Sequence, residues 1–124
     1  MTTYAPVLYY DSGQIATIIL QPEGVLNYNG SDAYVQNITA VSPQVIGVFK
    51  PDLTAMSGFP VNMTALGVLS NVYIARFQLP SGLSSVGNYE VIVQYVDSQT
   101  SRERTKVYQL VVGTTMGNNS VVGI

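Results

Sequence analysis

Residues 79–96 read LPSGLSSVGNYEVIVQYV, and this stretch decides the fold class. In its second half, every second position is apolar or aromatic: Tyr89, Val91, Val93 and Tyr95. Polar Glu90 and Gln94 stand between them. Because successive side chains of a β-strand point to opposite faces of the sheet, this alternation predicts a half-buried strand over residues 89–96. The Pro, Gly and Ser residues that precede it predict a turn.

The same signals recur along the rest of the chain, whereas no helical spacing lasts three turns. Strands are predicted over residues 14–20, 34–41, 44–50, 71–79 and 106–112. Residues 51–70 lack steady alternation, and we interpret them as a long connection with one short strand that crosses between two sheets. Short strands separated by Gly and Pro are typical of a sandwich or a small barrel. We therefore predict an all-β domain.

Composition narrows the classes of function. The chain has 124 residues, 47% of them apolar, which is enough for one domain with its own core. Only 10% of residues are charged, against roughly 25% in ordinary proteins, and the net charge is −2. The few basic residues are scattered, so we expect no nucleic-acid partner. No apolar run reaches the roughly 20 residues of a membrane span, and we expect no membrane partner and no signal peptide.

The residues for common catalytic sites are missing from the sequence. The chain has no Cys and no His, so thiol nucleophiles, histidine bases and the usual zinc ligands are all excluded. We expect no cofactor, no metal and no catalytic residue. One enzyme pattern stays open, because Asp11-Ser12-Gly13 follows an apolar run as in homodimeric retropepsin-like aspartic proteases, and Leu110 to Gly113 resembles a second element of that family. The alternative, which the composition favours, is a turn leading into the first strand.

Two groups of tyrosines are candidate binding residues. Residues 1–13 precede the first clear strand, and we interpret them as an N-terminal arm, with a core over residues 14–112 and a C-terminal tail over 113–124. The arm would dock on a neighbouring subunit through Tyr4, Val7, Leu8, Tyr9 and Tyr10, unless it is simply frayed. Tyr28, Asn29 and Tyr34 surround a predicted tight turn and are candidates for exposed contacts, including contacts with glycans. Several strands also carry apolar residues on both faces, which predicts an oligomer or a tightly held protein partner.

A family resemblance adds to these predictions. Residues 79–93 are similar to the corner between the fifth and sixth strands of immunoglobulin-like sandwiches, where a tyrosine hydroxyl bonds back to upstream backbone. Tyr89 fits that tyrosine, and residues 106–112 resemble the last strand, although the Cys and Trp of antibody cores are absent. The resemblance implies an Ig-like antiparallel β-sandwich of about seven strands with extended terminal arms.

The chain as a whole resembles the Ig-like modules of tailed-phage structural proteins, such as capsid decoration proteins and head fibres. The resemblance implies a non-enzymatic virion subunit, assembled in the host cytoplasm, that binds its own copies, the major capsid protein or another virion protein. A carbohydrate-binding or receptor-binding module is the alternative.

Overall fold

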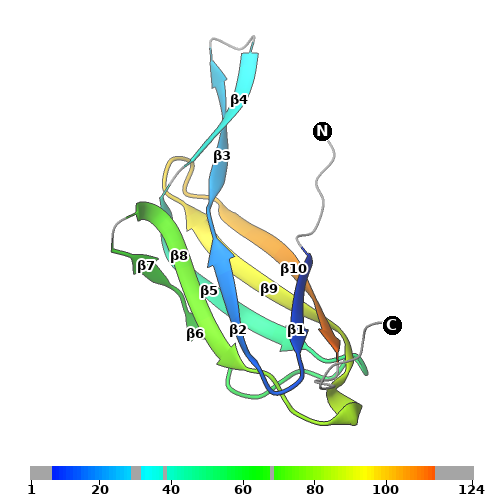
Figure 1. Cartoon of the computed structure of the whole chain (residues 1–124). Coiled ribbons are helices and arrows are strands. Elements are labelled where there is room, and N and C mark those ends of the chain that lie inside the picture. The colour runs from blue at the N-terminus through cyan, green and yellow to red at the C-terminus, as the bar shows by residue number, and fades with distance from the viewer. Residues whose placement is uncertain (1–6, 29–31, 38, 68, 114–124) are drawn as a thin grey trace.

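The computed structural model describes residues 7–28, 32–37, 39–67 and 69–113 and is an all-β sandwich (Figure 1). Its elements follow in chain order: β1 (Val7–Asp11), β2 (Ile15–Leu20), β3 (Glu23–Tyr28), β4 (Asp32–Asn37), β5 (Ala40–Phe49), β6 (Val61–Asn62), β7 (Thr64–Leu66), β8 (Leu69–Gln78), a 3₁₀ turn η1 (Leu83–Ser85), β9 (Gly87–Asp97) and β10 (Glu103–Gly113). The predicted fold class is confirmed.

Two sheets form the sandwich. The five-stranded sheet has the order β1-β10-β9-β5-β6, and the three-stranded sheet has the order β2-β8-β7. If β5, β9 and β10 are taken as strands C, F and G, and β2, β7 and β8 as B, D and E, this is the Ig-like arrangement. One pairing differs from the antiparallel expectation: β1 runs parallel to β10, from Val7 opposite Gln109 to Asp11 opposite Gly113.

The core lies between the facing surfaces of the two sheets. The alternation predicted from the sequence is found in β9, where Tyr89, Val91, Val93 and Tyr95 are all buried. Tyr73 and Ala75 of β8, and Leu79 directly after it, face the same core from the three-stranded sheet, while Arg76 and Gln78 are exposed. In the same sheet, β2 contributes Ala16, Ile18 and Leu20, each fully buried.

Two tyrosine hydroxyls fix a corner of the sandwich and a contact between its two sheets. The Tyr89 hydroxyl donates to the carbonyl of Ser85 at 2.6 Å, which is the tyrosine corner expected from the sequence. The Tyr108 hydroxyl donates to the Ile19 carbonyl of β2 at 2.7 Å. Burial, with a contribution from nearby Tyr95, raises the pKa of Tyr108. The hydroxyl therefore stays protonated as a donor at any ordinary pH.

Three segments depart from the predicted boundaries. Residues 7–11 belong to the sheet as β1 rather than to an arm, because their backbone pairs with β10. The predicted break at Ser42-Pro43 is a bulge inside a continuous β5, where Ser42 takes a φ of 51° and the pairing with β9 slips. The connection 51–70 does cross between the sheets, with β6 paired to β5 and β7 paired to β8.

Strands β3 and β4 form a hairpin that projects from one end of the sandwich (Figure 1). The sequence predicts the turn and a strand over residues 34–41, but it does not predict β3. The hairpin is a separate two-stranded sheet, and its register runs from Glu23 opposite Asn37 to Tyr28 opposite Asp32.

Candidate functional site

The first candidate surface is the outer face of the five-stranded sheet, which is the side turned away from the core. Strand register places its residues in rows across the sheet. Gly47, Ile92 and Val107 form one row, with Phe49, Glu90 and Gln109 in the next. The apolar side chains on this face are Val7, Tyr9, Val41, Phe49, Ile92, Val96, Val107 and Val111.

These apolar side chains are partly open to solvent. Tyr9 is 76% exposed, Val41 49% and Val7 47%, while Ile92 and Val107 in the middle are half-buried by their neighbours. Several large apolar side chains exposed on one sheet face are candidates for a binding site in a soluble protein. The prediction of apolar residues on both faces of β9 and β10 is thus confirmed.

The charges at outward positions of this sheet are all acidic: Asp11, Glu90 and Glu103. Lys106 occupies an inward position opposite Val93, and its ammonium lies 5.5 Å from the ring centre of Tyr108. A partner for the outer face should therefore be apolar at its centre and carry basic groups at its margin.

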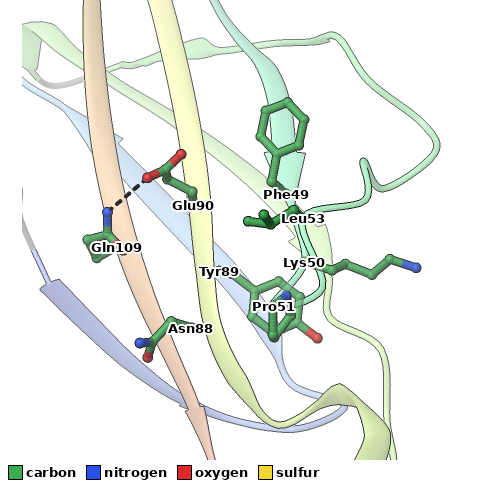
Figure 2. Close-up of a pocket in the computed structure, with 8 residues that line it drawn as sticks. All are labelled: Phe49, Lys50, Pro51, Leu53, Asn88, Tyr89, Glu90 and Gln109. Carbon is green, nitrogen blue, oxygen red and sulfur yellow. Dashed lines mark hydrogen bonds between the residues drawn. The ribbon is translucent and has the colours of Figure 1, made fainter.

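A pocket of about 440 Å³ opens at one end of the outer face (Figure 2). Phe49 and Leu53 lie on one side of it, and Glu90 and Gln109 lie on the other, joined by a 3.3 Å hydrogen bond from the Gln109 amide to the Glu90 carboxylate. Asn88 adds a further exposed polar group. An aromatic ring beside amide and carboxylate groups can bind a polar ligand that has one apolar face.

Leu53 is held in a costly conformation at the rim of this pocket. Its φ is 71°, which bulky side chains avoid, and 84% of the residue is exposed. Two backbone hydrogen bonds fix the loop, from Lys50 to the Thr54 carbonyl and from Leu53 to the Lys50 carbonyl, each 2.8 Å. The exposed side chain gains no burial energy that would offset this backbone strain. Its exposure to solvent is therefore a candidate functional feature.

The carboxylate of Asp52 tightens the same loop. It accepts hydrogen bonds from the hydroxyl and the backbone N–H of Thr54, at 2.6 and 3.0 Å. These bonds, together with the charge of Lys50, hold the pKa of Asp52 below its usual value. The loop also packs tightly on β9, because a Cβ added at Gly87 would lie 2.7 Å from Pro51.

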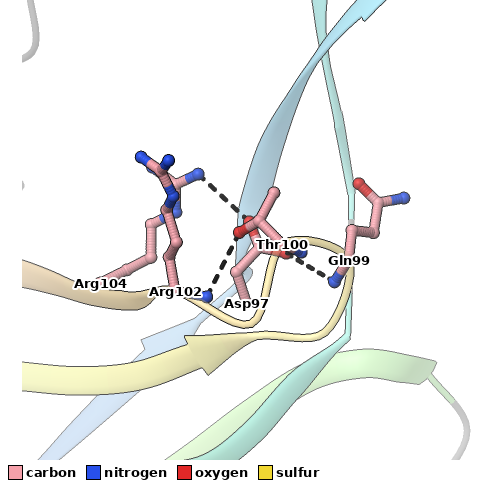
Figure 3. Close-up of polar contacts among 5 residues, drawn as sticks. All are labelled: Asp97, Gln99, Thr100, Arg102 and Arg104. Atoms are coloured by element: carbon pink, nitrogen blue, oxygen red, sulfur yellow. Dashed lines mark hydrogen bonds and ion pairs between the residues drawn. The ribbon is translucent and has the colours of Figure 1, made fainter.

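A second braced loop, residues 98–102, joins β9 to β10 (Figure 3). Buried Asp97 accepts hydrogen bonds from the backbone of Gln99 and Thr100 at 2.8 and 3.2 Å and forms an ion pair with Arg104 at 3.2 Å. Burial by itself raises the pKa of Asp97, but these hydrogen bonds outweigh it and hold the pKa below its usual range. The arrangement fixes the turn and leaves no free carboxylate for chemistry.

Strand β1 separates the predicted arm residues into two groups. Leu8 and Tyr10 pack against the core, and the Tyr10 hydroxyl donates to the Thr17 carbonyl at 2.9 Å. Only Val7 and Tyr9 point outward, because side chains alternate along a strand. Val7 and Tyr9 are therefore the arm residues that the structure leaves open to a partner, while Leu8 and Tyr10 face the core; docking through this segment stays a prediction. Tyr4 lies outside the described residues.

The other predicted contact residues lie on the hairpin. Tyr28 is the last residue of β3 and pairs with Asp32, and Tyr34 lies in β4, where it pairs with Leu26. Asn29 lies outside the described residues. The sequence did not indicate Leu53 and its pocket, since an exposed leucine in a loop carries no local signal.

Asp11-Ser12-Gly13 forms a surface turn between β1 and β2. The Gln14 backbone donates to the Asp11 carbonyl at 3.1 Å, and Gly13 has a φ of 80° that suits glycine. This is the turn that the composition favoured. Among the residues that the structure describes, no group of three acidic side chains could hold a metal ion. The same residues contain no helix long and apolar enough to cross a membrane.

No family model matches the chain, and no curated protein or solved structure is detectably similar to it. The surfaces of the molecule are therefore the basis for inferring its function.

Proposed function

We propose that this chain is a non-enzymatic structural subunit of a phage virion, of the capsid decoration type, that binds a neighbouring virion protein. The outer face of the five-stranded sheet carries the proposal, because Ile92 and Val107 form an apolar row at its centre, and Val7, Tyr9 and Val41 on the same face are largely open to solvent. Burying such a surface contributes about 25 cal/mol for each Å² of apolar area removed from water. The resemblance of the sequence to Ig-like phage modules supports the virion assignment.

The charge pattern favours a different protein over a second copy as the partner on this face. Asp11, Glu90 and Glu103 are acidic, and no basic residue stands at an outward position of the described sheet. Two such faces in contact would have no basic groups to complement their acids, and like charges across an interface are unfavourable. A capsid surface with basic side chains around an apolar centre would match.

The test measures how much of the chain is incorporated into particles. Particles are purified from cells that produce the wild-type chain, Ile92→Lys or Thr64→Lys, and the copies per particle are measured by quantitative mass spectrometry. Ile92→Lys places a charge in the centre of the outer face and should lower occupancy at least tenfold. Thr64→Lys adds the same charge at an exposed position of β7 in the other sheet and should leave occupancy unchanged. Equal occupancy for both variants, or wild-type chain absent from particles, would contradict the proposal.

The pocket beside Leu53 supports a second candidate function, the binding of a saccharide. Phe49 provides an aromatic surface, and Asn88, Glu90 and Gln109 provide hydrogen-bonding groups for hydroxyls around about 440 Å³. Saturation-transfer NMR with a panel of common monosaccharides tests this candidate. Signal that disappears in Phe49→Ala would support it, and no transfer from the wild-type protein to any sugar would exclude these ligands.

A further inference from the structure

The β3–β4 hairpin has two unpaired edges. Among the described strands, β3 and β4 pair only with each other, so each six-residue strand has one side with no strand neighbour (Figure 1). Backbone N–H and C=O groups on such an edge can pair with a further strand. A two-stranded hairpin away from a core is also marginally stable in water, and three or more strands are needed for independent stability.

The base of the hairpin is firmly attached to the sandwich. On the β3 side, Leu20 and Pro22 are buried. On the β4 side, the Thr39 hydroxyl donates to the Ser98 hydroxyl at 2.8 Å, and the Ala40 backbone donates to the Tyr73 hydroxyl at 3.0 Å. Residues on both sides of the hairpin, Leu20 and Pro22 before β3 and Thr39 and Ala40 after β4, are therefore held by the sandwich.

The composition of the two strands leaves their edges unprotected. Proteins usually block free edges with Lys, Pro or bulges, but β3 and β4 contain no Lys, Arg or Pro, and their register runs without a shift. Their two acids, Glu23 and Asp32, stand at strand ends. The middle rows, Val25 opposite Val35 and Leu26 opposite Tyr34, are uncharged.

We infer that the hairpin pairs edge to edge with the hairpin of a second copy of this chain. Such a contact is two-fold symmetric, and it turns two marginal hairpins into one four-stranded sheet. If β3 pairs antiparallel with its own copy in full register, Glu23 lies opposite Tyr28, and in β4 the same pairing sets Asp32 opposite Asn37. Neither pairing opposes like charges, in contrast to the acidic outer face. The inference goes beyond the proposed function and uses a different surface.

Charge complementation between two variants tests whether the partner is a second copy. One variant carries Val25→Lys with Val35→Lys, and the other carries Leu26→Glu with Tyr34→Glu. In the full register, Val25 lies opposite Leu26 of the second copy, and Val35 lies opposite Tyr34. Each variant therefore sets a charge against an uncharged residue in its own dimer, and only the mixed dimer sets Lys opposite Glu. The dissociation constant of each variant should rise about tenfold or more above that of the wild type. An equimolar mixture should recover association as a mixed dimer. Sedimentation velocity measures the association, and native mass spectrometry with one variant isotope-labelled identifies the mixed species.

A double variant of Ser57→Lys and Thr64→Lys, both at exposed positions outside the hairpin, is the control and should associate as the wild type does. Circular dichroism and thermal melting establish that each variant keeps its sandwich. A wild-type protein that stays monomeric at every concentration reached would overturn the inference. So would hairpin variants that associate normally, or folded variants whose mixture does not associate. Loss of association in Ile92→Lys alone would assign self-contact to the outer face instead.

Discussion

Replacing Leu53 by glycine should stabilise this protein, although it deletes a large apolar side chain. Leu53 has a φ of 71°, where the Cβ of an L-residue crowds the backbone. Its side chain contributes little to the core, because the residue is 84% exposed. The substitution thus removes strain and loses almost no buried surface.

The magnitude follows from two opposing terms. A left-handed conformation costs an ordinary residue roughly 1–2 kcal/mol, which glycine does not incur. Glycine loses more backbone entropy on folding, which costs about 0.5–1 kcal/mol. The free energy of unfolding should therefore rise by about 0.5–1 kcal/mol, and the midpoint of thermal unfolding should rise by about 2–4 °C.

The matched control is Leu83→Gly, measured by the same urea and thermal unfolding. Leu83 is 79% exposed, but among the described residues it is not one of the non-glycine positions with positive φ. Its replacement by glycine should lower the free energy of unfolding by about 0.5–1 kcal/mol, because only the entropic term applies. The two variants should therefore shift in opposite directions. If Leu53→Gly destabilises the protein as much as Leu83→Gly does, the reasoning about strain is wrong.

Three other substitutions test the Tyr89 corner, the turn held by Asp97 and the packing of Pro51 on Gly87. Tyr89→Phe should lower the free energy of unfolding by about 1.5–2 kcal/mol, because it leaves a buried carbonyl without its 2.6 Å partner; the same change at exposed Tyr9 should stay within about 0.5 kcal/mol. Asp97→Asn should lower the free energy of unfolding by about 2 kcal/mol near neutral pH, because it removes the charge that Arg104 and the turn backbone bind. The folded-state pKa of Asp97 lies below its ordinary value of 3.8. The extra stability of the wild type is therefore complete at a pH above 3.8 and shrinks as the pH falls below it. Urea titrations of both proteins at several pH values measure this difference. Gly87→Ala should lower the free energy of unfolding by about 1–3 kcal/mol, because its Cβ would lie 2.7 Å from Pro51. The NMR amide resonances of the loop that contains Leu53 should shift as well. Unchanged resonances there would contradict the packing argument.

The sequence by itself determined the class of fold and the faces of its central strands. Alternation is a local property of an extended backbone, so the buried positions of β8 and β9 could be predicted before any pairing was known. The corner formed by Tyr89 was equally local, because the hydroxyl reaches a carbonyl only four residues upstream.

Only the tertiary structure decided how distant segments combine. Residues 7–11 show apolar and aromatic residues without a strand signal, and they become β1 because β10, about 100 residues further along, offers a parallel edge. The outer face exists only once four strands set Val7, Val41, Ile92 and Val107 on one side of a sheet. Pairing between strands depends on contacts that no short window of sequence contains.

The candidate sites show the same division. Tyr28 and Tyr34 were visible in the sequence as residues around a turn, yet the pairing of β3 with β4, which sets Tyr34 opposite Leu26, is known only from the structure. The left-handed Leu53 could not be predicted, since leucine avoids that conformation and the hydrogen bonds that Thr54 donates to Asp52 help impose it. The alternation of residues along a strand determines which way a side chain points, and the pairing of strands into sheets determines which residues it contacts.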